Sequence, residues 1–178
     1  MKAVYARFEP PVPATVLEPH QLKLVLMQPQ IAPNTGNIAR LCVATSTQLH
    51  LVRPLGFVLS DRELRRSAMD YWPRLKLTVH DDDAAFFAVA GAPAPASGRM
   101  WLFTSKGKRP FWDARFAGND WLVFGNETAG LTSAMLRKHE DTCLRIPQID
   151  GERCLNLATA AGIGLYEALR QISQAREL

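Results

Sequence analysis

The sequence predicts one α/β domain built on a mostly parallel sheet with flanking helices. Short runs of continuous apolar residues, typical of strands buried on both faces, alternate with helix-length segments from residue 22 to residue 173. The chain has 178 residues, close to the usual size of one domain. Of these residues, 47% are apolar, 21% charged and 8% aromatic, a composition that supports a buried core.

The expected elements follow one another along the chain. Residues 1–20 are rich in proline and predict an extended arm, which leaves 21–178 as the single domain. Strands are expected at residues 22–27, 49–52, 75–79, 100–104, 121–124 and 142–146. Helix-length segments are expected at residues 35–46, 61–69, 82–90 and 155–173. Five or six strands with covering helices form one layered domain.

The last predicted helix is amphipathic, because its apolar residues recur every three or four positions. It is also rich in small residues, which allow another helix or a sheet to approach closely: Ala158, Ala160, Ala161, Gly162 and Gly164. This face can pack in the core of the domain, or it can form an interface between two copies of the chain.

Several broad classes of function are disfavoured. No apolar run is long enough to span a membrane and the first 20 residues lack the apolar core of a signal peptide, so a cytoplasmic protein without a membrane partner is expected. The three cysteines and four histidines are scattered, which predicts neither disulfides nor a metal site. The GxGxxG, GxxxxGK[ST], HExxH and GxSxG motifs are missing, which weakens the case for a generic nucleotide-binding enzyme, a zinc protease or a hydrolase.

Positive charge is concentrated in one region. The net charge is +4, and residues 53–115 hold 11 of the 21 basic residues. Two segments of this region interleave basic and aromatic residues, RELRRSAMDYWPRLK at 62–76 and SKGKRPFW at 105–112. Such a surface can neutralise phosphates and stack on unpaired bases. The alternative is a solvated face beside aromatic residues of the core.

Three polar, glycine-containing segments each follow a predicted strand, where open α/β sheets assemble their ligand sites. The segments are QPQIAPNTGNIARLC at 28–42, LVFGNETAGL at 122–131 and RIPQIDGERCLNLATAAG at 145–162. In the first, Asn34 or Thr35 is expected to cap a helix, which leaves N–H groups free for an anion. A capped turn with a surface arginine is the simpler interpretation of this segment.

Arg40 falls one turn into that predicted helix, near enough to contact the same anion. In the second segment, a strand-exit turn explains Gly125, but the neighbouring Asn126 and Glu127 go beyond what a turn requires. In the third segment, Asn156 can be an N-cap, a ligand contact or both. The three segments together therefore predict one polar ligand site at the carboxyl edge of the sheet.

The order and wording of the three segments resemble the SpoU-type branch of the SPOUT methyltransferases, most closely its small members that methylate the wobble-nucleotide ribose of tRNA. The likeness covers about residues 22–173 and includes RPLGF at 53–57, LRRSAMDYW at 64–72 and FTSKG at 103–107. It implies an S-adenosylmethionine-dependent tRNA 2′-O-methyltransferase acting on a wobble cytidine or modified uridine. It also implies a C-terminal deep trefoil knot and a homodimer that pairs through the first and last helices.

The resemblance assigns roles to individual residues. Arg40 is expected to face the reacting hydroxyl, with Asn34, Glu127 and Asn156 holding that hydroxyl and the substrate phosphate. The expected cofactor contacts are Phe103, Thr104, Gly125, Ile146, Cys154 and Leu155. The expected tRNA contacts are Arg62, Arg65, Arg66, Arg74, Lys106, Lys108 and Arg109.

Three alternatives stay open beside this interpretation. The chain can be a non-catalytic RNA-binding protein on the same scaffold, or a 2′-O-methyltransferase of another tRNA or rRNA position. Within the enzyme, Arg40 can be the base or a phosphate clamp, because a guanidinium has five N–H donors and no acceptor, which makes it a poor base. The sequence also departs from its relatives at Cys154, where serine is common, and at Asn126, where proline or lysine is common.

Overall fold

Every strand pairing in the described part of the chain is parallel, and the strand order is β3-β2-β1-β6-β4-β7-β5. The computed structural model describes residues 17, 19–59, 69–91 and 98–175. The strands are β1 (Lys23–Met27), β2 (Gln48–Val52), β3 (Leu77–His80), β4 (Met100–Phe103), β5 (Arg109–Pro110), β6 (Trp121–Phe124) and β7 (Cys143–Arg145). The prediction of an α/β fold with a parallel sheet is confirmed.

Alternate residues of the central strands face opposite sides of the sheet. In β1, Leu24 and Leu26 belong to one hydrophobic cluster, whereas Val25 and Met27 belong to another. All four side chains are buried. Burial on both faces explains why the strands read as continuous apolar runs in the sequence. Strand β5 carries no such run, because it has only two residues, and the sequence does not predict it.

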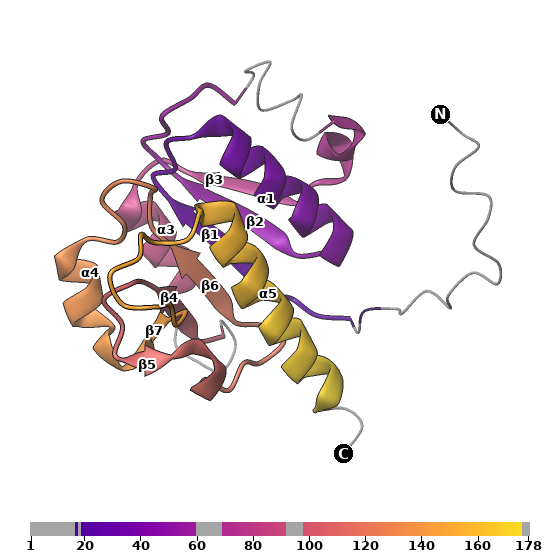
Figure 1. The fold of residues 1–178 in the computed structure, drawn as a ribbon. Helices are drawn as coiled ribbons and strands as arrows, with labels where there is room; N and C mark the ends of the chain where they lie inside the picture. Colours follow the sequence, from indigo (N-terminus) through magenta and orange to yellow (C-terminus); the bar gives the residue numbers. More distant parts are fainter. Residues whose placement is uncertain (1–16, 18, 60–68, 92–97, 176–178) are drawn as a thin grey trace, which may run out of the picture.

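Helices cover both faces of the sheet (Figure 1). Helices α1 (Ala32–Thr45) and α5 (Leu157–Gln174) lie side by side on one face and contribute to the first cluster. Helices α3 (Asp83–Ala90) and α4 (Ser133–Lys138) contribute to the second cluster on the other face. Three short 3₁₀ helices complete the described elements: η2 (Met69–Arg74), η3 (Phe111–Asp113) and η4 (Glu140–Thr142).

The predicted helices at 82–90 and 155–173 are confirmed with small shifts at their ends. Helix α4 has only six residues and no clear apolar period, and the sequence does not predict it. The predicted helix at 61–69 lies outside the described residues except for Met69, which begins η2. The proline-rich arm at 1–20 also lies outside them, apart from residues 17, 19 and 20.

The small residues of α5 bring it close to the sheet. Ala161, Gly164 and Ala168 are buried against the first cluster. A Cβ on Gly164 would stand 2.8 Å from Cζ of Phe103 in β4 and 3.3 Å from Cζ of Phe124 in β6. Real Cβ contacts are longer than this, so the helix needs a glycine here to lie against the two rings. Packing in the core therefore accounts for the buried small residues of α5, whereas Ala158, Ala160 and Gly162 are only partly buried.

No helix in the described ranges has both the length and the apolar character that crossing a bilayer would require. The same residues contain no group of three or more His, Cys, Asp and Glu side chains placed to hold a metal ion.

Candidate functional site

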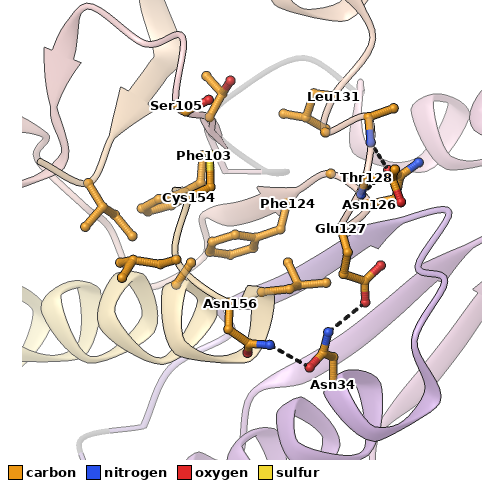
Figure 2. Close-up of a pocket in the computed structure, with 18 of the residues that line it drawn as sticks. Asn34, Phe103, Ser105, Phe124, Asn126, Glu127, Thr128, Leu131, Cys154 and Asn156 are labelled. Carbon is orange, nitrogen blue, oxygen red and sulfur yellow. Dashed lines mark hydrogen bonds between the residues drawn. The ribbon is translucent and has the colours of Figure 1, made fainter. Parts of the chain in front are cut away.

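A cavity of about 500 Å³ lies at the carboxyl edge of the sheet, among the segments that follow β1, β4, β6 and β7. This volume is within the range of small-molecule sites. Each of the three polar segments predicted from the sequence contributes to its wall. The cavity is lined by all six of the predicted cofactor contacts, Phe103, Thr104, Gly125, Ile146, Cys154 and Leu155. Figure 2 shows how side chains from these segments converge on it.

Three of the four predicted catalytic residues form one chain of hydrogen bonds on the wall of this cavity (Figure 2). The side-chain nitrogen of Asn156 donates to Oδ1 of Asn34 across 2.9 Å. The side-chain nitrogen of Asn34 donates to Oε1 of Glu127 across 3.0 Å. The amino end of α5, the amino end of α1 and the exit of β6 are therefore fixed to one another by these three side chains.

The orientation of both amides follows from their partners. Oδ1 of Asn156 accepts from the backbone N–H groups of Ala158 and Thr159, so Asn156 is the N-cap of α5. Its nitrogen is left to donate to Asn34, and Asn34 in turn must present its own nitrogen to Glu127. One N–H of each amide and one lone-pair site on Oε2 of Glu127 remain for a ligand.

Glu127 also holds the turn that leads into α1. Its Oε2 accepts from the backbone N–H of Gln30 at 2.9 Å, and its Oε1 accepts from that of Ile31 at 3.3 Å. The predicted N-cap at Asn34 or Thr35 is wrong, because α1 begins at Ala32 with Ile31 as an N-cap that makes no side-chain bond. Proline is tolerated in the first helical turn, which allows α1 to begin before Asn34. The anion beside this helix start is the chain's own carboxylate.

Arg40 does not line the cavity. The predicted position one turn into the helix is wrong, since an α1 that begins at Ala32 places Arg40 more than two turns from its start. Its side chain is exposed. The guanidinium carbon lies 5.3 Å from the ring centroid of Tyr71 in η2. The structure therefore separates Arg40 from Asn34, Glu127 and Asn156 of the same chain.

The segment after β6 is folded so that its backbone borders the cavity. Oδ1 of Asn126 accepts from the N–H groups of Thr128 and Ala129 at 3.0 and 2.6 Å. Gly130 adopts a φ of +68°, in the left-handed region that favours glycine. A Cβ on Gly125 would stand 2.1 Å from the carbonyl carbon of Gly130. Glycine at 125 is therefore required by the close approach of two backbone segments.

The three cysteines differ in their exposure to solvent. Cys42 and Cys143 are buried, and burial raises the pKa of both thiols. Cys154 is exposed and lines the cavity, between Ile146 and Asn156 along the chain. It is therefore the thiol that solvent and cavity ligands can reach.

The basic residues predicted to contact RNA have varied surroundings. Arg62, Arg65 and Arg66 lie outside the described residues. Arg74 stacks on Tyr71, with 5.1 Å between its guanidinium carbon and the ring centroid. Lys108 pairs with Glu140 at 2.8 Å, which raises the pKa of Lys108 and lowers that of Glu140.

Arg109 packs over the ring of Trp101 and donates to the backbone carbonyl of Asp113. Lys106 lines both the cavity and a second cavity of about 420 Å³ beside it. Among the interleaved aromatics, Phe111 is buried in the core, as the alternative interpretation expects, whereas 56% of Trp112 is exposed.

Sequence reasoning missed some contacts of the site. The backbone donors at Gln30 and Ile31 carry no recognisable signal, because any residue type supplies an N–H. Ser105 also lines the cavity, and the FTSKG stretch at 103–107 is the one signal that includes it.

Comparison with known proteins gives a consistent result. Residues 21–166 match the model of the SpoU rRNA Methylase family. The chain is 45% identical over 149 residues to a tRNA (cytidine(34)-2′-O)-methyltransferase of Burkholderia pseudomallei, which covers 83% of this chain and 94% of that protein. It is 44% identical over 149 residues to the protein of the same name from Burkholderia ambifaria, with the same coverage.

Solved structures of methyltransferases are also similar to this chain. One, from work on 2-OH methylation of C/U34 on tRNA, has a TM-score of 0.82 and 43% identity, and the match covers 88% of this chain and 99% of that one. The methyltransferase AviRb of Streptomyces viridochromogenes, in complex with AdoMet, has a TM-score of 0.75 and 26% identity over 88% of this chain and 59% of that one.

Proposed function

Because this chain belongs to the SpoU rRNA methylase family, we propose that it transfers a methyl group from S-adenosylmethionine to the ribose 2′-hydroxyl of the wobble nucleotide of tRNA. The observation that carries the proposal is the hydrogen-bonded triad of Asn34, Glu127 and Asn156 on the wall of a ligand-sized cavity. Relatives with 44% and 45% identity over most of both chains carry the name of this activity. A target of cytidine or uridine at position 34 is therefore proposed.

The cavity fits S-adenosylmethionine in size and in chemistry. Its wall combines apolar side chains, such as Ile146 and Leu155, with the backbone of two loops that bring polar groups to it. Gly125 allows the loop after β6 to fold tightly beside that space. We propose that Phe103, Thr104, Gly125, Ile146, Cys154 and Leu155 contact the cofactor. When bound, it would supply a sulfonium methyl group, whose bond to sulfur breaks as an attacking oxygen takes the methyl carbon in line, with a neutral thioether as the leaving group.

The residues of the chain must orient the ribose hydroxyl and receive its proton. The remaining N–H groups of Asn34 and Asn156 can hold a hydroxyl or phosphate oxygen at the cavity wall. Glu127 is the one carboxylate among the described residues that line the cavity, and one lone-pair site on its Oε2 is free. We propose that the hydroxyl proton passes to this oxygen as the oxygen–carbon bond forms.

Arg40 has a different role in this proposal. A guanidinium carries five N–H donors and no acceptor, so Arg40 acts as a clamp on the RNA and a stabiliser of developing charge rather than as the base. Its separation from the cavity of its own chain supports an action on the cavity of a second copy.

We propose a homodimer in which α1 and α5 form the interface and each site uses residues of both chains. The two helices pack side by side, and 54% of Tyr166 on α5 is exposed, more than an apolar ring in the core would be. Mixed dimers of Arg40→Ala and Asn156→Ala chains test this. If Arg40 acts on the partner's cavity, one site of each mixed dimer is intact and activity returns. If Arg40 acts on its own cavity, both sites stay inactive.

We also propose that the carboxyl-terminal part of the chain forms a deep trefoil knot. Strand β7 lies beyond β4 in the sheet, whereas α5 packs on β6 and α1. The chain between Arg145 and Leu157 must therefore cross back over β4. A crystal structure in which the backbone, traced from one end to the other, forms a trefoil knot would establish this proposal.

A methylation assay tests the proposed function. Total tRNA from cells that lack this protein is incubated with the purified chain and labelled S-adenosylmethionine, and the modified nucleotide is mapped by mass spectrometry. The proposal expects a 2′-O-methyl group at the wobble nucleotide of a subset of tRNAs. Methylation at another tRNA or rRNA position favours that alternative. RNA binding without any transfer favours a non-catalytic RNA-binding protein.

A further inference from the structure

Two arginines from different elements stack on one tyrosine. The guanidinium carbons of Arg40 in α1 and Arg74 in η2 lie 5.3 and 5.1 Å from the ring centroid of Tyr71. Both arginines are exposed, and Tyr71 is half-buried. Trp72, the next residue, packs against the core below α1 and anchors η2 there. The ring of Tyr71 is therefore fixed by its neighbours, and it in turn fixes the positions of both guanidinium groups.

Stacking of this kind prepares a guanidinium to bind an anion. The attraction to the ring acts on the flat face of the guanidinium, whereas its five N–H donors lie in its plane. The planar fork matches the oxygens of a phosphate. The arrangement therefore favours a ligand that carries negative charge.

The position of the two arginines further restricts which anionic ligands they can bind. Neither Arg40 nor Arg74 lines the cavity proposed for the cofactor. An anion that binds both of them therefore lies on the outer surface of the chain, where a nucleic acid backbone can reach. Plain surface packing also places arginines on aromatic rings, but it does not require two of them on the same ring.

We propose that Tyr71 is a positioning residue that holds Arg40 and Arg74 as a clamp for an RNA phosphodiester near the methylated ribose. This inference rests on the proposed function and goes beyond it, because it adds Tyr71 to the residues that place the substrate. It also changes the sequence interpretation of Tyr71, whose ring serves the chain's own cations instead of stacking on a base.

Three variants test the clamp in the methylation assay. Tyr71→Leu removes the ring face, Tyr71→Phe restores it without the hydroxyl, and Arg74→Ala removes one exposed cation. Phe87→Leu is the matched control, because Phe87 also carries a stacked cation, Lys138 at 5.5 Å, on the opposite face of the sheet. Cofactor affinity by calorimetry and the salt dependence of RNA binding are measured for each variant.

The expected results separate positioning from folding. Tyr71→Leu lowers kcat/KM for tRNA by roughly 5- to 30-fold, the loss expected from two cation–π contacts, and leaves cofactor affinity within about twofold. Tyr71→Phe rescues the rate. Arg74→Ala and Tyr71→Leu each flatten the plot of log affinity for RNA against log salt concentration, by about 0.7 for one phosphate contact. Phe87→Leu changes neither readout.

Other outcomes overturn the inference. A Tyr71→Leu chain that turns over like the wild type excludes the positioning role, and equal losses in Tyr71→Leu and Tyr71→Phe assign the effect to the hydroxyl. Loss of cofactor affinity in Tyr71→Leu together with an unchanged salt dependence in Arg74→Ala assigns a structural role alone. A wild-type chain without methyl transfer overturns the proposed function instead, and the salt dependence of RNA binding then decides the clamp by itself.

Discussion

The side-chain nitrogen of Asn156 donates to Oδ1 of Asn34 across 2.9 Å, although 122 residues separate the two in the sequence. Through this bond and the next one, to Glu127, three loops at the carboxyl edge of the sheet have one fixed arrangement. The order of donors is determined by the backbone N–H groups that Asn156 caps. A substitution that replaces a hydrogen-bond donor with an acceptor should therefore cost more stability than one that only removes the donor.

Asn34→Asp is expected to destabilise the protein more than Asn34→Ala. The new carboxylate would face Glu127 at the position where a nitrogen now donates across 3.0 Å. An unsatisfied buried polar group costs about 1–3 kcal/mol, and the like charge adds to this loss. Thermal melts at pH 8 and pH 4.5 measure the difference, which should narrow at the lower pH because a protonated carboxyl can donate again. Equal melting temperatures of the two variants at pH 8 would contradict the donor order.

Arg40→Ala is expected to lower methyl transfer at least about 100-fold, the scale of an essential polar group in catalysis. Cofactor affinity should stay near that of the wild type, because Arg40 does not line the cavity. Arg99→Ala is a matched control, since Arg99 also stacks on an aromatic ring, Trp101, but precedes β4 at the opposite edge of the sheet. Turnover above half of the wild-type rate in Arg40→Ala would refute its role.

Gly125→Ala is expected to weaken cofactor binding at least about tenfold. The added Cβ would meet the backbone of Gly130 and Leu131 at 2.1 and 2.3 Å, so the loop that borders the cavity must move. Gly162→Ala is the control, because its Cβ would meet only a side-chain atom of Leu41 at 3.9 Å. Isothermal titration with S-adenosylmethionine compares the two. Unchanged affinity in Gly125→Ala would show that this loop does not shape the site.

The protein is expected to lose stability as the pH falls, because of the buried pair of His50 and His80. Their ring nitrogens lie 2.9 Å apart. Burial, followed by the charges of His80 and Lys23, lowers the pKa of His50 to about 4. A pKa lowered from 6.5 contributes stability that is fully present above pH 6.5 and is lost as the pH falls towards 4.

His50→Gln should flatten this dependence, because glutamine can still bond to His80 but does not titrate in this range. Chemical denaturation between pH 4 and pH 8 measures the free energy of unfolding of both proteins. Parallel curves would exclude His50 as the source of the pH dependence.

Cys154 is expected to be the first thiol that a maleimide modifies, because Cys42 and Cys143 are buried. Modification should abolish cofactor binding, since Cys154 lines the cavity, and S-adenosylmethionine should slow the reaction. Mass spectrometry of the labelled protein identifies the site. Cys154→Ser should retain activity after maleimide treatment, and its inactivation would point to one of the buried thiols.

Much of the fold follows from local patterns in the sequence. The apolar run at 22–27 corresponds to β1, because a strand buried on both faces has apolar residues at successive positions. The three- and four-residue spacing at 155–173 corresponds to α5, because a helix buried along one stripe has apolar residues at that spacing. The convergence of Asn34, Glu127 and Asn156 could also be expected, since the carboxyl ends of parallel strands meet at one edge.

Other features depend on contacts that no local pattern encodes. The start of α1 at Ala32 depends on a carboxylate, Glu127, that lies 97 residues beyond Gln30. The stacking of Arg40 on Tyr71 depends on how η2 packs against α1. A strand of two residues, such as β5, has too few side chains to form a pattern.

Helix α1 carries Asn34 at the cavity and Arg40 at the ring of Tyr71. The two residues are six positions apart, so their Cα atoms are separated by about 9 Å along the helix axis, and no rotation of a side chain alters that backbone spacing. In the proposed dimer, where Arg40 acts on the cavity of the partner, the helix would therefore hold the two methyl-transfer sites at a fixed offset. An RNA whose backbone does not fit this offset would then be rejected by its shape, before any base is read.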